Sequence, residues 1–271
     1  MPNAPSPAAY ALTLTRLDGL GRVSAHRLLG HFPTVEALRD APTEAVLVRL
    51  KGVPRAADLV RRLRETEQLD EALAQTQAEV AALEAKRMHV LAPPDARWPA
   101  RLNDLDRSVR PIALYAFGAV ERLAEAAVAF WARSPMEPEP FERAQDEARR
   151  AVEAGDVLVA GARDGFDVVI HKLAYLAKQP SIAVAAAGLG RLPGPVRPHA
   201  TSIVRAGGLV VSPFPMTHGP FEHDQVDAAF VAAALARAII GAGEPDSPAA
   251  RALAWAAEHD RYALDLGAAT E

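Results

Sequence analysis

Apolar positions along the chain change their spacing near residue 87. Before this point they recur at helical spacing, and the run TEQLDEALAQTQAEVAALEAK at 66–86 contains no helix breaker. After it, short apolar runs alternate with longer segments of helical spacing. The pattern predicts an all-helical N-terminal part, a connecting helix and then an α/β part.

The second part reads as buried strands separated by helices. Uninterrupted apolar strands joined by helices of ten or more residues favour a mostly parallel sheet with helices on both faces, an extended Rossmann-like α/β fold. Ligands of such sheets bind at the carboxyl ends of the strands. The expected strands are 90–91, 113–116, 127–131, 157–160, 182–185, 208–211, 238–240 and 262–264, and the expected helices include 140–154, 166–178 and 248–259.

The N-terminal part repeats one pattern twice. A helical run, a glycine turn and a second helical run occur around Gly19 and again around Gly52. This is the form of a helix-hairpin-helix (SAM-like) unit, which can contact a DNA phosphate; the alternative is a small helical bundle whose glycines only permit sharp turns. The candidate phosphate contacts are Arg22, Lys51 and Arg55, whereas we interpret Arg61, Arg62 and Arg64 as a solvated helix face.

These patterns define the expected domain organisation. We predict a disordered tip at 1–8, a helical domain at 9–66, a connecting helix at 67–87 and a Rossmann-like domain at 88–271.

Composition limits the function classes. A net charge of -4 and a pI near 6.1 argue against a protein that coats nucleic acid by bulk positive charge, but leave room for a local basic patch. The absence of cysteine removes disulfides, thiolate nucleophiles and cysteine metal sites. We find no secretory signal and no apolar run of membrane-spanning length, so we expect a cytoplasmic protein with no membrane partner.

One strand, turn and helix carries the main candidate site. In VLVAGARDGFDVVIHKLA, Gly161 and Gly165 let the backbone approach an anion, and Arg163 would favour phosphate if it pointed into the cleft. The alternative is that Asp164 caps the helix with Asp167 three residues later, which would use the same amides internally. Both readings remain open.

The helix after this turn carries further polar residues. Asp167 and His171 share one helix face, as an acid/base or ribose-contacting pair or as a local hydrogen bond. Lys172 could reach a backbone phosphate from the helix surface.

Two later loops belong to the same edge of the expected sheet. The loop after 182–185 holds Gly188, Gly190, Arg191 and Arg197, and the Pro-rich loop that begins at Ser212 carries His218 and His223. These histidines lack the spacing of a metal site, and no hydrolase elbow or P-loop occurs. The sequence therefore supports neither a hydrolase nor a P-loop ATPase, and we expect no metal and no cofactor.

A series of incomplete motifs resembles one family. RWPARLNDL with RPIALYAFG, then VAFWARS, EAGDVLVAGARDGFDVVIHKLA, SIAVAAAGLGRLP and RAGGLVVSPFP follow the order of motifs in the DprA/Smf DNA-processing proteins, across about 97–267. The resemblance implies a non-enzymatic protein that binds single-stranded DNA, forms a homodimer and delivers DNA to a RecA-type recombinase in transformation and repair. Some members carry a C-terminal winged helix, which we do not expect after the ending LGAATE.

In this family a basic pocket over the glycine turns holds the phosphates. The resemblance therefore implies a DNA-binding or phosphate-binding site formed by Arg133, Ser134, Gly161, Arg163, Gly165, Lys172, Gly188 and Arg191.

Three departures affect that pocket. Asp164, Asp224 and Val226 stand where the family has arginines, and Arg133 is one place out of step with its Gly-Ser-Arg motif. An aspartate directed at a phosphate would repel it strongly. Two alternatives therefore stay open: a protein-binding relative that has lost the DNA pocket, and a nucleotide-binding or phosphoribohydrolase-like protein. For the latter, Glu244 and Glu258 are the nearby acids, although the family loop Pro-Gly-Gly-x-Gly-Thr-x-x-Glu is missing.

Overall fold

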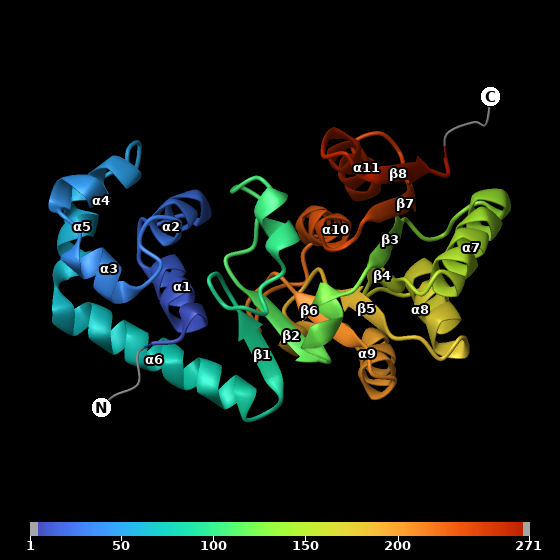
Figure 1. Cartoon of the computed structure of the whole chain (residues 1–271), viewed down its shortest axis with the longest axis horizontal. Coiled ribbons are helices and arrows are strands. Elements are labelled where there is room, and N and C mark those ends of the chain that lie inside the picture. The colour runs from blue at the N-terminus through green and yellow to red at the C-terminus, as the bar shows by residue number, and fades with distance from the viewer. Residues whose placement is uncertain (1–4, 268–271) are drawn as a thin grey trace. The chain divides into compact units, whose positions relative to one another are not determined.

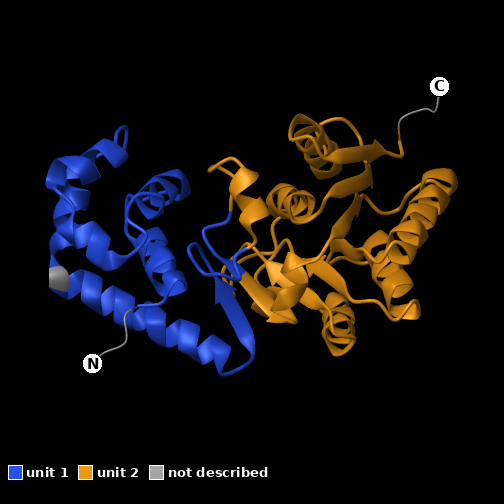
Figure 2. Cartoon of the chain, in the orientation of Figure 1, with its two compact units in different colours: residues 1–98, 111–114 blue, residues 99–110, 115–271 orange. Residues whose placement is uncertain are grey.

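The computed structural model describes residues 5–267, apart from the side chain of Thr66. The chain divides into two compact units (Figure 2). The first contains the residues up to 98 together with 111–114, and the second contains 99–110 and the residues from 115 onward. Within the described residues, no helix is long and apolar enough to cross a membrane.

The first unit is helical (Figure 1). Its helices are α1 (Pro7–Arg16), α2 (Arg22–Leu29), α3 (Val35–Asp40), α4 (Thr43–Arg49), α5 (Ala56–Arg64) and α6 (Thr66–Glu84). Helix α1 begins inside the segment 1–8 that we expected to be disordered, because the Ser6 hydroxyl accepts a hydrogen bond from the amide of Ala9 at 3.2 Å. Residues 1–4 of that segment lie outside the described residues.

Two glycine turns join helices in this unit. Gly19 between α1 and α2 has φ +89°, and Gly52 between α4 and α5 has φ +86°, a backbone region that favours glycine. Arginines fasten the turns across the sequence. Arg62 donates to the carbonyl of Asp18 at 2.6 Å, and Arg27 donates to the carbonyl of Lys51 at 3.0 Å. Each hairpin is thus held by a side chain from the other.

We had expected the arginines at the end of α5 to form a solvated helix face. The structure shows that this is wrong for two of them. Arg62 and Arg64 donate to backbone carbonyls, Arg64 to that of Ala41. Of the three, Arg61 fits the expectation, because it forms an exposed pair with Asp58 at 3.3 Å.

Within residues 5–267, eight strands form one mixed sheet, mostly parallel as predicted, in the order β1-β2-β6-β5-β4-β3-β7-β8. The strands β3 to β8 pair in parallel, whereas β2 runs antiparallel to β6. The chain moves outward from β3 to β6, then returns to place β7 on the other side of β3. The strands are β1 (Met88–Leu91), β2 (Leu114–Gly118), β3 (Ala127–Ala132), β4 (Val157–Gly161), β5 (Ser181–Val184), β6 (Leu209–Ser212), β7 (Ala238–Ala242) and β8 (Tyr262–Asp265).

In the described part of the second unit, five α-helices follow the strands. They are α7 (Pro138–Glu153), α8 (Phe166–Leu176), α9 (Val196–Arg205), α10 (Asp224–Leu235) and α11 (Pro248–Glu258). Short 3-10 helices occur at Ala100–Asp104, Val120–Ala124 and Leu189–Arg191. Helices α9 and α10 were not predicted. The start of α9 was not recognised because the segment PGPVRP contains three prolines, which usually indicate a loop. Helix α10 is apolar on almost all sides, so its sequence shows no helical period.

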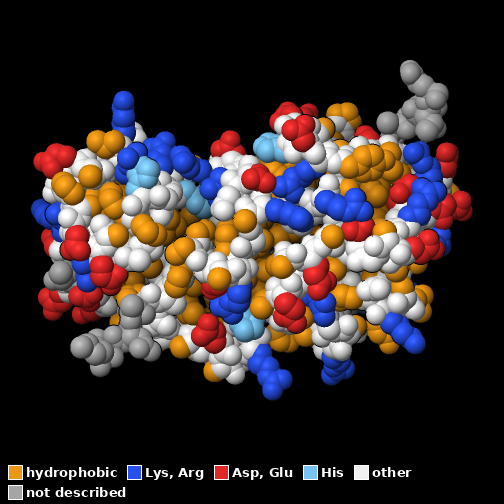
Figure 3. Space-filling view, viewed as in Figure 1, with side chains coloured by type: hydrophobic (Ala, Val, Ile, Leu, Met, Phe, Trp, Pro, Cys, Tyr) orange, Lys and Arg blue, Asp and Glu red, His pale blue; other side chains and the backbone are white. Residues whose placement is uncertain are grey.

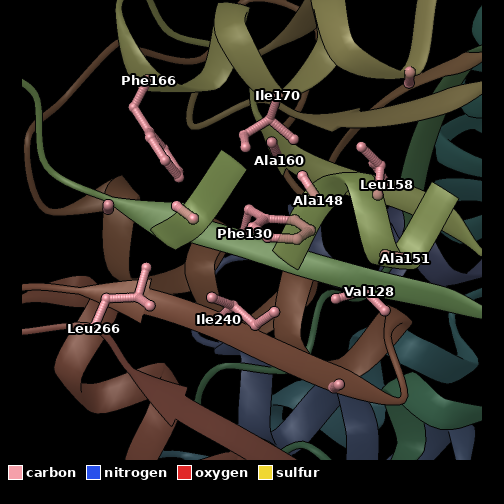
Figure 4. Packing of buried hydrophobic residues seen from close by; sticks show 14 residues of the cluster. Val128, Phe130, Ala148, Ala151, Leu158, Ala160, Phe166, Ile170, Ile240 and Leu266 are labelled. Carbon is pink, nitrogen blue, oxygen red and sulfur yellow. The ribbon is translucent and has the colours of Figure 1, made fainter. Parts of the chain in front are cut away.

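The core lies on both faces of the central strands. All six residues of β3 are buried, as expected for a strand covered by helices on both sides. On one face, Phe130 and Ile240 of the sheet pack with Phe166 and Ile170 of α8 and with the alanines of α7 (Figure 4). Helix α10 covers the opposite face of β3 and β4, and α9 packs on β5 and β6.

Candidate anion-binding site at the carboxyl edge of the sheet

A cleft of about 680 Å³ lies where the strand order reverses, beside the last residues of β3 and β7. This is the position at which open α/β sheets bind their ligands. Basic side chains come from the ends of β3 and β4, and the opposite wall comes from the starts of α10 and α11. The lining residues are Trp131, Ala132, Arg133, Arg163, Glu222, His223, Gln225, Val226, Ala242, Ser247, Pro248 and Ala249.

Arg163 lines the cleft, but its charge is already paired. Its Nε donates to Oδ2 of Asp167 at 2.6 Å, and its Nη2 donates to Oδ1 at 2.9 Å. Nη2 also donates to the carbonyl of Ala132 at 3.0 Å, and the guanidinium stacks over the Trp131 ring, 4.5 Å from its centroid. The Asp167 side chain is 1% exposed, so the pair is anchored inside the protein.

Gly161 at the end of β4 makes this ion pair possible. A Cβ on Gly161 would lie 2.2 Å from Oδ2 of Asp167 and 2.9 Å from Nε of Arg163. The glycine therefore leaves room for the Arg163–Asp167 pair rather than for an approaching phosphate.

The start of α8 is also occupied by a protein group. The Ser134 hydroxyl accepts a hydrogen bond from the amide of Phe166 at 2.8 Å. The N-cap residue is Gly165, with φ +77°, and a Cβ there would lie 2.5 Å from the Ser134 Oγ. The alternative in which Asp164 caps this helix is therefore wrong: Asp164 is exposed in the turn, and Ser134 from the loop after β3 satisfies the first amide.

Arg133 is the basic residue of the cleft that keeps its charge available. Its side chain is exposed, directly after β3, and among the described residues it has no hydrogen bond or acidic partner. Glu222 on the opposite wall is the acidic residue of the lining, and Asp164 is exposed in the turn beside Arg163. Within the part of the chain that the structure describes, the cleft thus offers the unpaired guanidinium of Arg133, the paired guanidinium of Arg163 and the acidic Glu222.

Asp224, which we expected to repel a phosphate, is turned into the protein. It is 3% exposed and accepts from Nε2 of His218 at 2.9 Å, while Nε2 of His223 lies 3.4 Å away. His218 also stacks on Phe214, with ring centroids 4.7 Å apart. Asp224 therefore anchors the loop after β6 and contributes much less repulsion than the sequence suggested.

The glycines after β5 serve loop packing. The amide of Gly188 donates to the carbonyl of His218 at 2.9 Å, and that of Gly190 donates to the carbonyl of Met216 at 3.1 Å. A Cβ on Gly188 would lie 2.0 Å from the carbonyl oxygen of Pro215. These amides are committed to the loop after β6, whereas Arg191 is exposed beside them.

The Asp167–His171 pair predicted from helical spacing is not a hydrogen-bonded pair. Nδ1 of His171 contacts the Ser181 hydroxyl at 3.0 Å, and Nε2 contacts the Gly161 carbonyl at 3.0 Å. Burial lowers the pKa of His171, against the opposing effects of the Gly161 carbonyl and the Asp167 carboxylate. This histidine ties α8 to β4 and β5.

The predicted residues thus separate into groups. Arg133 and Arg163 meet in the cleft, Ser134 and Gly165 form the helix cap, and Gly188 and Arg191 lie on the neighbouring loop. Lys172 lines a different groove, between α8 and α9. Among the described residues, no group of three histidine or acidic side chains could hold a metal.

The wall formed by Gln225, Ser247 and Pro248 was not predicted from the sequence. The Ser-Pro start of α11 was visible in the sequence. The reversal of strand order also points to this wall, but it is known only from the sheet topology. The acids considered for a phosphoribohydrolase, Glu244 and Glu258, are exposed and are not among the residues that line the cleft.

In the first unit, basic side chains gather at one end (Figure 3). Residues 16–65 hold ten arginines and lysines against six acidic residues, whereas 66–86 hold five acidic residues and one lysine. A hollow of about 430 Å³ lies at the glycine turns, and Arg55, Arg61 and Arg62 line it together with Asp18 and Asp58. DNA contact by Arg22, Lys51 and Arg55 stays a prediction.

The fold and cleft define a doubly wound α/β protein with a helical N-terminal unit and a basic site at the switch point of its sheet. The model of the DNA recombination-mediator protein A family matches residues 89–266, and the chain belongs to this family of DNA-processing proteins.

Two solved structures share the fold. DNA processing protein A (DprA) from Streptococcus pneumoniae is 17% identical, with a TM-score of 0.70 over 97% of this chain and 87% of that one. DNA processing protein A from Helicobacter pylori, whose structure concerns its mode of binding single-stranded DNA, is 18% identical, with a TM-score of 0.54 over 66% of this chain and 80% of that one. A comparison with curated proteins finds no match.

Proposed function

We propose that this protein binds single-stranded DNA through its phosphates at the carboxyl edge of the sheet, without chemical turnover. The observation that carries the proposal is the family match over residues 89–266, the segment that contains the cleft. The single-stranded DNA binding of the Helicobacter pylori protein supports the same ligand.

The geometry supports a specific division of roles within this site. Arg133 is exposed and has no acidic partner among the described residues, so it is the group proposed to contact a phosphate. Arg191, exposed on the next loop, is the second candidate. Arg163, Ser134 and the glycines are proposed to shape the site, because their polar groups are already bonded within the protein.

A protein-binding role is the second candidate. It is favoured by the neutralisation of Arg163 by Asp167 and by the exposed Asp164 in the turn, which together weaken the site for an anion. In that case the fold would persist after loss of the DNA pocket.

Family membership also supports two wider parts of the proposal. We infer that the protein passes DNA to a RecA-type recombinase in transformation or recombinational repair, and that it acts in the cytoplasm as a homodimer. Light scattering after size exclusion tests the dimer, and recombinase loading on DNA coated by a single-strand-binding protein tests the transfer.

The direct test of DNA binding is a titration of a labelled oligothymidine followed by fluorescence anisotropy. Binding at low salt that weakens steeply as salt is added supports the proposal. A flat titration at low salt and micromolar protein would favour the protein-binding role instead.

A further inference from the structure

A second groove lies in the same unit, beside the amino end of β5. Its volume is about 640 Å³, and it runs between α8 and α9 with Ser181, the first residue of β5, among its lining residues. The cleft described above lies instead beside the last residues of β3 and β7. The two are therefore separate sites.

The groove is lined by basic residues without acidic ones. Lys172, His199 and Arg205 line it, and no aspartate or glutamate does. Among the described residues, none of these three side chains has a hydrogen bond or an acidic partner. The positive charges of Lys172 and Arg205, without a counter-charge in the lining, raise the local potential, which favours an anionic ligand.

The remaining lining suits a flat aromatic group beside that anion. Tyr175 near the end of α8 is 63% exposed and lines the groove, so its aromatic ring is accessible to a ligand. Gln179 and Ser202 add amide and hydroxyl groups, and Val168 and Ile203 add apolar surface. Aromatic stacking beside cationic side chains is the combination by which proteins hold nucleotides.

The base of the groove is firmly built. His171 is buried, and its two ring nitrogens contact the Ser181 hydroxyl and the Gly161 carbonyl, both at 3.0 Å. These contacts hold α8 against the sheet, and the next residue of this helix, Lys172, lines the groove with an exposed side chain. The volume lies within the range of about 300 to 1,000 Å³ that is usual for small-molecule sites.

We propose that this groove binds a nucleoside phosphate, with Lys172 and Arg205 on the phosphate and Tyr175 against the base. The proposal goes beyond the proposed function, which concerns the cleft at the carboxyl ends of β3 and β7. The ligand is either a free mononucleotide or one nucleotide of a DNA strand, since both present the same chemistry.

The test uses the whole chain and two probes, thymidine monophosphate followed by calorimetry and a labelled oligothymidine followed by anisotropy. The double variant Lys172→Gln with Arg205→Gln removes both charges from exposed positions, so the fold should persist, and thermal melting checks this. Arg149→Gln, an exposed residue of α7, is the matched control.

The double variant is expected to lose affinity by about tenfold or more, because two charge-assisted contacts to phosphate are removed. A loss for thymidine monophosphate identifies a free nucleotide as ligand, and a loss for the oligothymidine alone identifies a strand. Tyr175→Ala should weaken the same probe, and Tyr175→Phe should restore it. Equal affinity of the double variant and the unmodified protein for both probes, or no binding of either probe, overturns the proposal.

One further variant separates this proposal from the proposed function. Arg133→Gln should weaken the oligothymidine but leave thymidine monophosphate binding unchanged, because Arg133 lies in the cleft and not in the groove. If Arg133→Gln has no effect while the double variant does, the groove stands and the cleft fails as the DNA site.

Discussion

Arg163 and Asp167 form a two-bond ion pair across the turn that opens α8, with donor to acceptor distances of 2.6 and 2.9 Å. The aspartate is buried and the arginine is partly exposed at the cleft. The ion pair therefore neutralises the positive charge of Arg163 in the turn, so that Arg163 attracts a phosphate less strongly.

Replacing Asp167 tests whether the ion pair stabilises the folded protein and weakens its binding of phosphate. We expect Asp167→Asn to lower the free energy of unfolding by about 2 kcal/mol, because a buried partner of Arg163 is lost. The same variant should bind single-stranded DNA more tightly, because the guanidinium gains free charge beside the cleft. Urea denaturation and anisotropy measure the two effects. Asp146→Asn, which breaks an exposed pair on α7, should change neither; an unchanged Asp167→Asn stability would refute the structural role.

Gly161→Ala probes the same pair from the backbone side. The new Cβ would lie 2.2 Å from Oδ2 of Asp167, so the ion pair must shift, and we expect a loss of about 1 to 3 kcal/mol in unfolding free energy. Gly194→Ala has open space at its Cβ and should be nearly neutral. Equal melting temperatures for the two variants would show that the close contact at Gly161 does not constrain the fold.

His171 should make stability depend on pH. Burial holds its pKa below the ordinary value of 6.5, so below that pH the unfolded chain takes up a proton that the folded protein resists. The free energy of unfolding should thus fall on acidification from pH 7, by at most about 1.4 kcal/mol per pH unit from this group. His171→Gln should show a smaller fall between pH 7 and 5, and the exposed His31→Gln is the control. Parallel pH profiles for the unmodified protein and His171→Gln would contradict this.

Restoring arginine separates the two acidic departures. Asp164 is exposed, so Asp164→Arg should fold normally and raise affinity for single-stranded DNA by removing a negative charge and adding a positive one. Asp224→Arg should instead destabilise the protein, because the position is buried and holds two histidines. Thermal melting and anisotropy distinguish these outcomes. Unchanged DNA affinity in Asp164→Arg would count against a phosphate near the turn.

Much of the fold could be predicted from local pattern. The strands at 127–131 and 157–160 were visible as apolar runs, and both are central strands of the sheet. Helix α10 was not visible, because burial between the sheet and α11 removed the alternation that marks an amphipathic helix. The domain boundaries predicted from the sequence stay a prediction.

The site was less predictable, because side-chain partners depend on tertiary contacts. Arg163 and Asp167 are four residues apart, yet the sequence does not show that the pair turns inward. The pairing of Ser134 with the amide of Phe166 joins residues 32 positions apart. From the sequence, Asp224 was expected to repel a phosphate, whereas in the structure it is buried against His218. The residue types at the site could be read from the sequence, but the directions in which their side chains point could not.

The proposed DNA site depends most directly on Arg133, the cation of the cleft that has no acidic partner among the described residues. The deciding measurement is the affinity for oligothymidine as a function of salt, for the unmodified protein and for Arg133→Gln. We predict weaker binding for the variant, with a salt slope shallower by about 0.7, the value for one lost phosphate contact to a single strand. Identical affinities and slopes for the two proteins would contradict the assignment of the cleft as the DNA site.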